Sequence, residues 1–152
     1  MRRSDKALQD DAVIQILQEG EYGVLSTVDG SGQPYGVPLN YSLKDNSLYF
    51  HCALEGHKLD NIIANEKVSF CVVGQTKVVP ADFTSEFESV IVTGTAEIVS
   101  GEEKFEGLVS LIEKYSPEFV EEGRKYIEKL DHETAVVRVG IASMTGKVSP
   151  AE

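Results

Sequence analysis

The sequence predicts a mainly β fold of the α+β class, a closed or split antiparallel β-barrel with peripheral helices. Near the N-terminus, three strand-like segments follow one another with only short turns between them. Two successive hairpins indicate antiparallel strands, because parallel strands need a long crossover connection. Strands and helices do not alternate regularly along the chain, which argues against a doubly wound parallel sheet.

The first half of the chain contains a helix followed by these three strands. Apolar residues recur at helical spacing within residues 5–19, and Gly20 is placed to end that helix. The Asp-Gly-Ser-Gly sequence at 29–32 is typical of a tight turn. Pro34 and Pro38 cannot donate hydrogen bonds to a ladder, so the second strand is expected to have an edge or a bulge. The predicted strands cover residues 22–28, 37–43 and 47–52.

The rest of the chain contains a short helix, two further strands, a pair of helices and a last strand. Gly94 lies inside a strand long enough to bend at that residue. Ser116 and Pro117 are suited to the N-cap and first position of a helix. The predicted elements are helices over 56–64, 104–115 and 117–130, and strands over 67–73, 86–99 and 134–139.

Length and composition fit one globular domain over residues 1–152. A domain of this size buries roughly 70% of its unfolded surface and needs no disulfide to hold a core. The N-terminus has no apolar run typical of a signal peptide, and no segment resembles a membrane span. We therefore expect a cytoplasmic protein in which Cys52 and Cys71 are reduced, although a disulfide between them stays open.

The formal net charge of −11 makes nucleic acid an unlikely partner, because the chain has no basic stripe to meet a phosphate backbone. A small anion is a different case. Charge is screened over ~8 Å at physiological salt, so the groups that line a pocket decide its preference. Any phosphate site must therefore be local.

Residues 48–60 are the best candidate for such a site. A strand is predicted to end near Cys52, a turn contains Gly56, and a helix begins near His57. Free N–H groups at a helix start attract anions, and Lys58 in the first turn adds a positive charge. Lysine opposes the helix dipole at this position, which suggests an anionic ligand, and a solvated surface residue is an equally good interpretation of the spacing.

His51 is predicted to lie on the strand face opposite Phe50, where it could face a ligand or simply end the strand. Asn40 and its neighbours lie on the adjacent strand, within reach of a heteroaromatic ring or in an ordinary pleat. The three histidines lack the spacing of a zinc site, so no metal is predicted.

These segments together resemble a known family, the pyridoxamine-phosphate-oxidase-like split-barrel flavoproteins, and in particular its nitroimidazole-resistance (Nim-type) branch. The resemblance runs through nearly the whole chain in the same order. It is carried by MRR at 1–3, GVLST at 23–27, QPYGVPLNY at 33–41, LYFHCA at 48–53, GHK at 56–58, FT at 83–84, SVIVTG at 89–94 and MTGK at 144–147.

The resemblance implies a Greek-key-like FMN-binding split barrel that forms homodimers, with FMN (or FAD) in clefts at the subunit interface. For the phosphate end, the resemblance implies that Lys58 and His57 anchor the phosphate and that Ser26 and Thr27 contact the phosphate or the ribityl chain. For the ring, it implies that the isoalloxazine is backed by Leu39, Asn40 and Tyr41, and that the same cleft is lined by His51, Cys52 and Ala53. It also implies that Ser89 adds a contact and that Phe83 and Thr84 reach the partner's flavin. The basic residues that grip the substrate phosphate in pyridoxamine-phosphate oxidases are not evident, which argues against vitamin B6 oxidation.

The leading hypothesis is an FMN-dependent oxidoreductase that passes electrons from a reduced nicotinamide to a small acceptor such as a nitroaromatic compound. His51 is the candidate proton donor. The chain has no GxGxxG fingerprint, so a nicotinamide would bind only transiently. Two alternatives stay open: a flavin-binding module without turnover, such as a store or sensor, and the same barrel holding haem or a deazaflavin.

Overall fold

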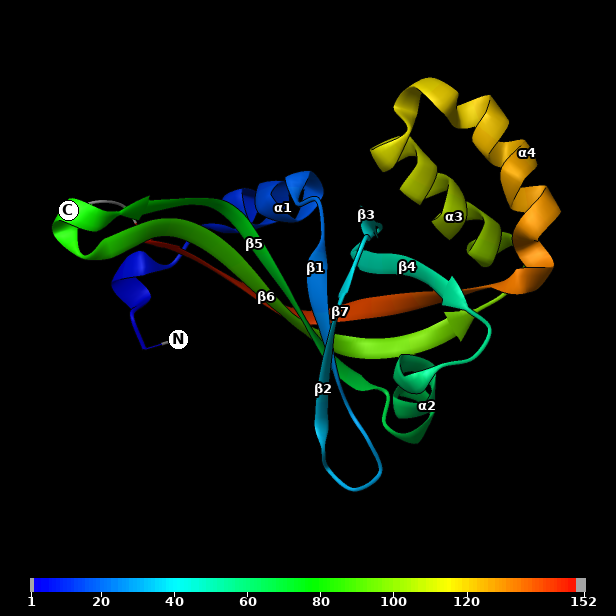
Figure 1. Cartoon of the computed structure of the whole chain (residues 1–152), viewed down its shortest axis with the longest axis horizontal. Coiled ribbons are helices and arrows are strands. Elements are labelled where there is room, and N and C mark those ends of the chain that lie inside the picture. The colour runs from blue at the N-terminus through cyan, green and yellow to red at the C-terminus, as the bar shows by residue number, and fades with distance from the viewer. Residues whose placement is uncertain (1, 150–152) are drawn as a thin grey trace.

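The computed structural model describes residues 2–149 and contains one seven-stranded antiparallel sheet (Figure 1). The strands of this described part are β1 (Gly23–Val28), β2 (Pro34–Leu39), β3 (Ser42–Lys44), β4 (Ser47–Ala53), β5 (Lys67–Val79), β6 (Thr84–Val99) and β7 (Thr134–Ser149). Its α-helices are α1 (Asp10–Glu19), α2 (His57–Ala64), α3 (Gly101–Tyr115) and α4 (Val120–Leu130). Within residues 2–149, no helix is long and apolar enough to cross a membrane.

The strand order β2-β1-β5-β6-β7-β4-β3 leaves β2 and β3 at the two edges of the sheet. Figure 1 shows the sheet curling, with α2 near one end of β4 and the α3–α4 pair at the side of the molecule away from the two termini. The predicted mainly β fold with peripheral helices is confirmed. Its barrel is the split form, because β2 and β3 are edges rather than a bonded pair.

The apolar residues form two clusters that the sheet separates. The larger cluster fills the barrel and includes Leu25, Phe50 and Phe70, each fully buried. The smaller cluster lies between the sheet and α3, where Tyr49 and Val136 pack against the helix. Alternation along β4 creates this division, since Phe50 points into the barrel and its neighbour Tyr49 points to the helices.

Two strands are longer than the sequence predicted, and together with β6 they form the extended arm in Figure 1. One of the predicted strands ended at Val73. In the structure, the ladder shifts register between Val73 and Thr76 and continues to Val79. β7 likewise continues past Val139 to Ser149, because β6 offers it a partner along this length.

The predicted strand over 37–43 is wrong, because the structure divides it into β2 and β3. Tyr41 lies between them, fully buried, and its hydroxyl donates a hydrogen bond to the Leu17 carbonyl at 2.6 Å. Its backbone N–H donates to the Tyr115 hydroxyl at 3.1 Å instead of to a strand. The apolar residues Val37, Leu39 and Tyr41 alternate as they would along one strand. In the structure β2 ends at Leu39, and Tyr41 is buried after that end.

The helix predicted over 5–19 is shorter, because Ser4–Lys6 forms a 3₁₀ turn and α1 begins at Asp10. The expected bend at Gly94 is present as a register shift in the β6–β7 ladder. A Cβ at Gly94 would lie 2.1 Å from the Gly140 carbonyl oxygen, so this close approach of two backbones requires glycine.

Lys114 on α3 is the one described side chain with a buried nitrogen that lacks a hydrogen-bond partner within residues 2–149. Its Nζ atom lies 3.8 Å from the centre of the Tyr41 ring, and the Tyr115 ring is also near, at 5.2 Å. The contact with the aromatic face offsets only part of the lost hydration. Burial lowers the pKa of Lys114 from 10.5 to about 8.

We expect Lys114→Met to raise the free energy of unfolding at pH 7 by about 1–3 kcal/mol, since it removes a poorly solvated charge and keeps the apolar stem. The native pKa is below the unfolded value, so the unfolded chain binds the extra proton between pH 8 and 10.5. The free energy of unfolding of the wild-type protein should therefore rise over this pH range, and its difference from that of Lys114→Met should shrink. Urea unfolding at several pH values measures this, with Lys125→Met on an exposed position of α4 as the control. An advantage that stays constant from pH 7 to 11 would contradict it.

Candidate functional site

The N-terminus of α2 is open, and its first turn carries both a cation, Lys58, and a carboxylate, Asp60. Gly56 precedes the helix with φ of +150°, and a Cβ placed there would meet no atom within 4 Å. Gly56 has no side chain to cap the helix, so the first N–H groups of α2 are available to an external acceptor. Lys58 lies in this first turn and is half-buried, and its charge acts on the Cys52 thiol at the end of β4.

Tyr35 of β2 stacks on His57 at the same place. Their ring centres are 4.1 Å apart and the planes are 28° from parallel. The pair joins the edge strand of the sheet to the first residue of α2, although the two segments are far apart in sequence. Tyr35 was not among the predicted site residues, because nothing in the sequence indicates which helix its ring would meet.

A buried hydrogen bond fixes α2 on the barrel. Asn61 donates from Nδ2 to the Thr27 Oγ1 atom at 2.9 Å, and both side chains are almost completely buried. The Thr27 side chain therefore points into the core and supports the helix. Its neighbour Ser26 points to the opposite, exposed face of β1.

The end of β4 lies beside this helix start. Phe50 is fully buried, His51 and Ala53 face outward, and Cys52 is half-buried. Burial raises the pKa of the Cys52 thiol, while the positive charge of Lys58 acts in the opposite direction. The two residues are thus close enough to interact, and the thiol stays protonated at neutral pH.

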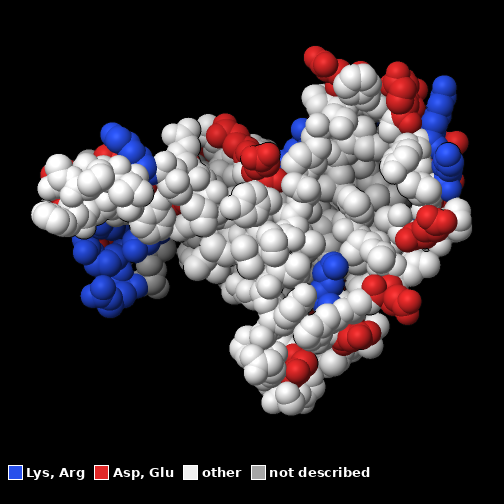
Figure 2. Space-filling model, in the orientation of Figure 1, with Lys and Arg blue, Asp and Glu red and all other residues white. Residues whose placement is uncertain are grey.

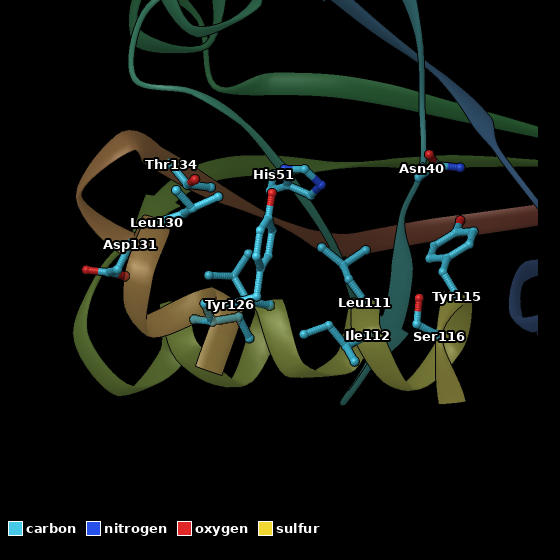
Figure 3. A pocket seen from close by; sticks show the side chains of 12 residues that line it. Asn40, His51, Leu111, Ile112, Tyr115, Ser116, Tyr126, Leu130, Asp131 and Thr134 are labelled. Atoms are coloured by element: carbon cyan, nitrogen blue, oxygen red, sulfur yellow. The ribbon is translucent and has the colours of Figure 1, made fainter. Parts of the chain in front are cut away.

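His51 also lines a cavity of about 320 Å³ between the barrel and the α3–α4 pair (Figure 3). Burial lowers the pKa of its imidazole below the ordinary value of 6.5, so the ring is mostly neutral at pH 7. Figure 3 shows Tyr126 of α4 directed toward His51, and Asn40 at the other side of the opening. Apolar side chains of α3 and α4 form the floor.

The segment that follows β2 is held by side-chain hydrogen bonds. Asn40 donates from Nδ2 to the Glu21 carbonyl at 2.9 Å, and Tyr115 donates its hydroxyl to the same oxygen at 2.6 Å. Leu39 ends β2 and packs against the barrel core. Of these predicted ring contacts, only Asn40 faces the surface, since the Tyr41 side chain is enclosed in the core.

Other predicted residues lie farther out. Ser89 lies on the outward face of β6, opposite Val73 and Lys147 in the ladders. Phe83 is 97% exposed in a left-handed conformation beside Thr84, at the turn between β5 and β6. The structure therefore brings His51, Cys52, Ala53, His57 and Lys58 together, and it separates Ser89, Phe83 and Thr84 from them along the arm.

Sequence reasoning missed Tyr35, Asn61 and Tyr126. Asn61 carries a signal that was available, since a polar residue on the apolar face of a short helix needs a buried partner. Tyr126 lies on a helix without any motif, and only the packing of α4 directs it to His51. The described residues contain no group of three side chains able to hold a metal ion.

The comparisons with known proteins identify a family and shared folds. Residues 9–148 match the family model described as pyridoxamine 5'-phosphate oxidase. The chain belongs to this family. A search of curated proteins found no significant match.

Solved structures share the fold at low sequence identity. A Bacteroides thetaiotaomicron protein, described as a candidate for 5-nitroimidazole antibiotic resistance, is 24% identical, with 93% of this chain and 86% of that chain covered and a TM-score of 0.75. An FAD-binding protein from Mesorhizobium loti is 22% identical (95% and 98% covered, TM-score 0.69). A haem storage protein from Vibrio cholerae is 13% identical (91% and 94% covered, TM-score 0.69). The predicted resemblance to the oxidase-like family is thus confirmed by the family match, and these solved structures share its fold.

We expect Asn61→Ala to lower the free energy of unfolding by about 1–3 kcal/mol, because Thr27 loses its buried partner. Urea denaturation measures this change. Ile63→Ala on the exposed side of the same helix is the control, and it should stay within about 0.5 kcal/mol of the wild type. Equal effects of the two substitutions would mean that the hydrogen bond contributes nothing specific.

Proposed function

We propose that this protein binds FMN between the start of α2 and the β2–β4 side of the barrel, and that it is an oxidoreductase. The observation that carries the proposal is the open N-terminus of α2, where uncapped N–H groups, the half-buried Lys58 and the Tyr35–His57 stack meet. The net charge of −11 gives no general attraction for anions, so a local cluster of this kind points to a specific anionic ligand.

The residues present fit a flavin phosphate. A dianion accepts hydrogen bonds from backbone N–H groups at a helix start, and an amine adds charge-assisted contacts. The space beside Gly56 leaves room for the approach of the ligand to the backbone. His51, Ala53 and Asn40 would lie along the ring and its edge, while Ser26 remains available to the ribityl chain.

FMN, when bound, would carry two electrons from a donor to an acceptor. The overall reaction that we propose is RNO₂ + NAD(P)H + H⁺ → RNO + NAD(P)⁺ + H₂O, in which the nitro group takes up two electrons and two protons. The nicotinamide supplies both electrons and one proton, and the second proton comes from solvent. His51 would pass this proton to the acceptor oxygen, because it is the titratable ring beside the proposed site.

We also propose that the protein is a homodimer. Outward side chains on adjacent strands form an apolar row, with Val24 opposite Cys71 and Cys71 opposite Ile91. Val24 is 36% exposed and Ile91 48%. Figure 2 shows charged side chains mainly at the rim of the face in view, with a broad uncharged centre. A second copy would cover such a row and bring the Ser89 and Phe83 region of one chain to the other.

The alternative is a flavin store or sensor that does not turn over. It is favoured by the exposed position of His51 and by the lack of a nicotinamide-binding motif. A bound haem is the other alternative, given the haem storage protein with the same fold. The absorption spectrum of the purified protein distinguishes flavin from haem.

We expect Lys58→Ala to weaken FMN binding about tenfold to hundredfold, since one charge-assisted contact contributes roughly 1.5–3 kcal/mol. Lys58→Arg keeps the positive charge and should lose much less. Fluorescence quenching of free FMN measures both, and light scattering of the same samples should give a dimer mass. An unchanged dissociation constant for Lys58→Ala would place the phosphate elsewhere.

We expect FMN-loaded protein to bleach on addition of NADH or NADPH without oxygen, and to recover its colour with a nitroaromatic compound. If His51 is the proton donor, acceptor reduction slows as the pH rises through its lowered pKa, below 6.5. In His51→Gln this pH step should disappear while FMN binding persists. Stopped-flow absorbance measures both half-reactions. If the FMN-loaded protein does not bleach with either nicotinamide, the oxidoreductase function is contradicted and the flavin store or sensor remains.

A further inference from the structure

The α3–α4 pair is joined to the barrel by the chain at one end only. α3 begins just after β6, and α4 leads through the 3₁₀ turn Asp131–Glu133 into β7, the strand beside β6. At this base, the Lys104 amine lies 3.1 Å from the Asp131 Oδ1 atom. The turn between the two helices, residues 116–119, lies at the opposite end (Figure 1). The pair is therefore a helical hairpin fixed at its base.

Tyr115, the last residue of α3, tethers the free end of this hairpin. Its hydroxyl donates to the Glu21 carbonyl at 2.6 Å and accepts from the Tyr41 N–H at 3.1 Å. We refer to this contact of Tyr115 with Glu21 and Tyr41 as the latch. The next tie toward the base joins the Ser110 and Ser42 Oγ atoms at 2.6 Å. Among the described residues, no other hydrogen bond fastens the part of the hairpin beyond Ser110 to the barrel.

Lys114 lies beside the latch and weakens it when the amine is charged. Its Nζ atom is buried 3.8 Å from the centre of the Tyr41 ring and has no hydrogen-bond partner in the described part of the chain. A charged amine in this position loses its hydration, and the aromatic face offsets only part of that loss. Water would solvate the amine again if the end of α3 moved away from the barrel. Protonation of Lys114 therefore favours an open latch.

The other titratable groups around this amine respond differently to pH. Two phenols face it, Tyr41 from the segment after β2 and Tyr115 from α3 itself. Burial raises the pKa of the Tyr41 phenol, so that ring stays neutral up to about pH 9. Burial lowers the pKa of Lys114 to about 8. The carboxylates on the neighbouring elements, which contribute nothing to this lowered pKa, are Glu19, Glu21 and Glu113.

We propose that the latch is a pH-sensitive device, in which uncharged Lys114 holds the α3–α4 pair closed and its protonation releases the pair at the Tyr115 end. The cavity of about 320 Å³ lies beneath the pair, and Figure 3 shows Asn40, Tyr115 and Ser116 at this end of it. Release of the latch therefore widens access to the apolar floor of the cavity. The device involves no flavin, so it is independent of the proposed function.

Amide hydrogen exchange of the purified protein, followed by NMR from pH 7 to 9, tests this proposal. The Tyr41 N–H is the probe, because the Tyr115 hydroxyl is its acceptor. After correction for the intrinsic exchange rate, its opening constant should fall about tenfold over this range, since the open form exposes the amine and binds more protons above pH 8. In Lys114→Met the opening constant should be lower at pH 7 and should not change with pH. Lys114→Gln, which is also neutral, serves as a second variant if the first does not fold.

Two controls separate latch opening from other events. Lys125→Met removes an exposed lysine from α4 and should keep the pH dependence of the wild type. The Val92 N–H, in the middle of β6, reports unfolding of the whole barrel, so the opening constant of Tyr41 should exceed that of Val92 at least about tenfold. Equal opening constants for these two amides would mean that the latch opens only when the protein unfolds. The same pH dependence in Lys114→Met would mean that another group controls the latch, and either result overturns the proposal.

Discussion

The arrangement of the proposed site depends on one buried hydrogen bond, from Asn61 to Thr27. An amide and a hydroxyl inside an apolar core are tolerated only when each satisfies the other. This requirement fixes the rotation of α2 about its axis and its position along β1. Because α2 is only eight residues long, fixing Asn61 also fixes His57 and Lys58 one turn earlier. The positive end of the helix thus comes to lie beside the end of β4.

The barrel wall separates two environments that serve different chemistry. On the α2 side, backbone N–H groups and an amine create a polar site suited to a phosphate. On the α3–α4 side, apolar side chains enclose a cavity with a neutral imidazole at its opening. His51 lines the second environment, because it shares a strand face with Tyr49, whereas Phe50 between them points into the barrel. The two environments therefore differ in the groups that line them, which the net charge of −11 does not reveal.

The sequence was most informative where a local rule applies. The Asp-Gly-Ser-Gly turn, the strand over residues 47–52 and the helix after Gly56 were predicted correctly, since turn chemistry and local residue patterns act over a few residues. The division of 37–43 into β2 and β3 was missed, because it depends on Tyr115, which is 74 positions from Tyr41. The full lengths of β5 and β7 were missed for a similar reason, since an arm strand is stabilised by its ladder partners rather than by its own pattern.

The sequence alone determined the family, the antiparallel barrel and the location of a helix start at Gly56–Lys58. These follow from residue types that are close neighbours along the chain. Only the tertiary structure decided that Tyr35 stacks on His57 and that Tyr126 points toward His51 across a cavity. It also decided that Thr27 accepts a hydrogen bond from Asn61 instead of facing a ligand. Each of these contacts joins segments distant in sequence, and side-chain direction across such a distance is set by packing, which no local pattern encodes.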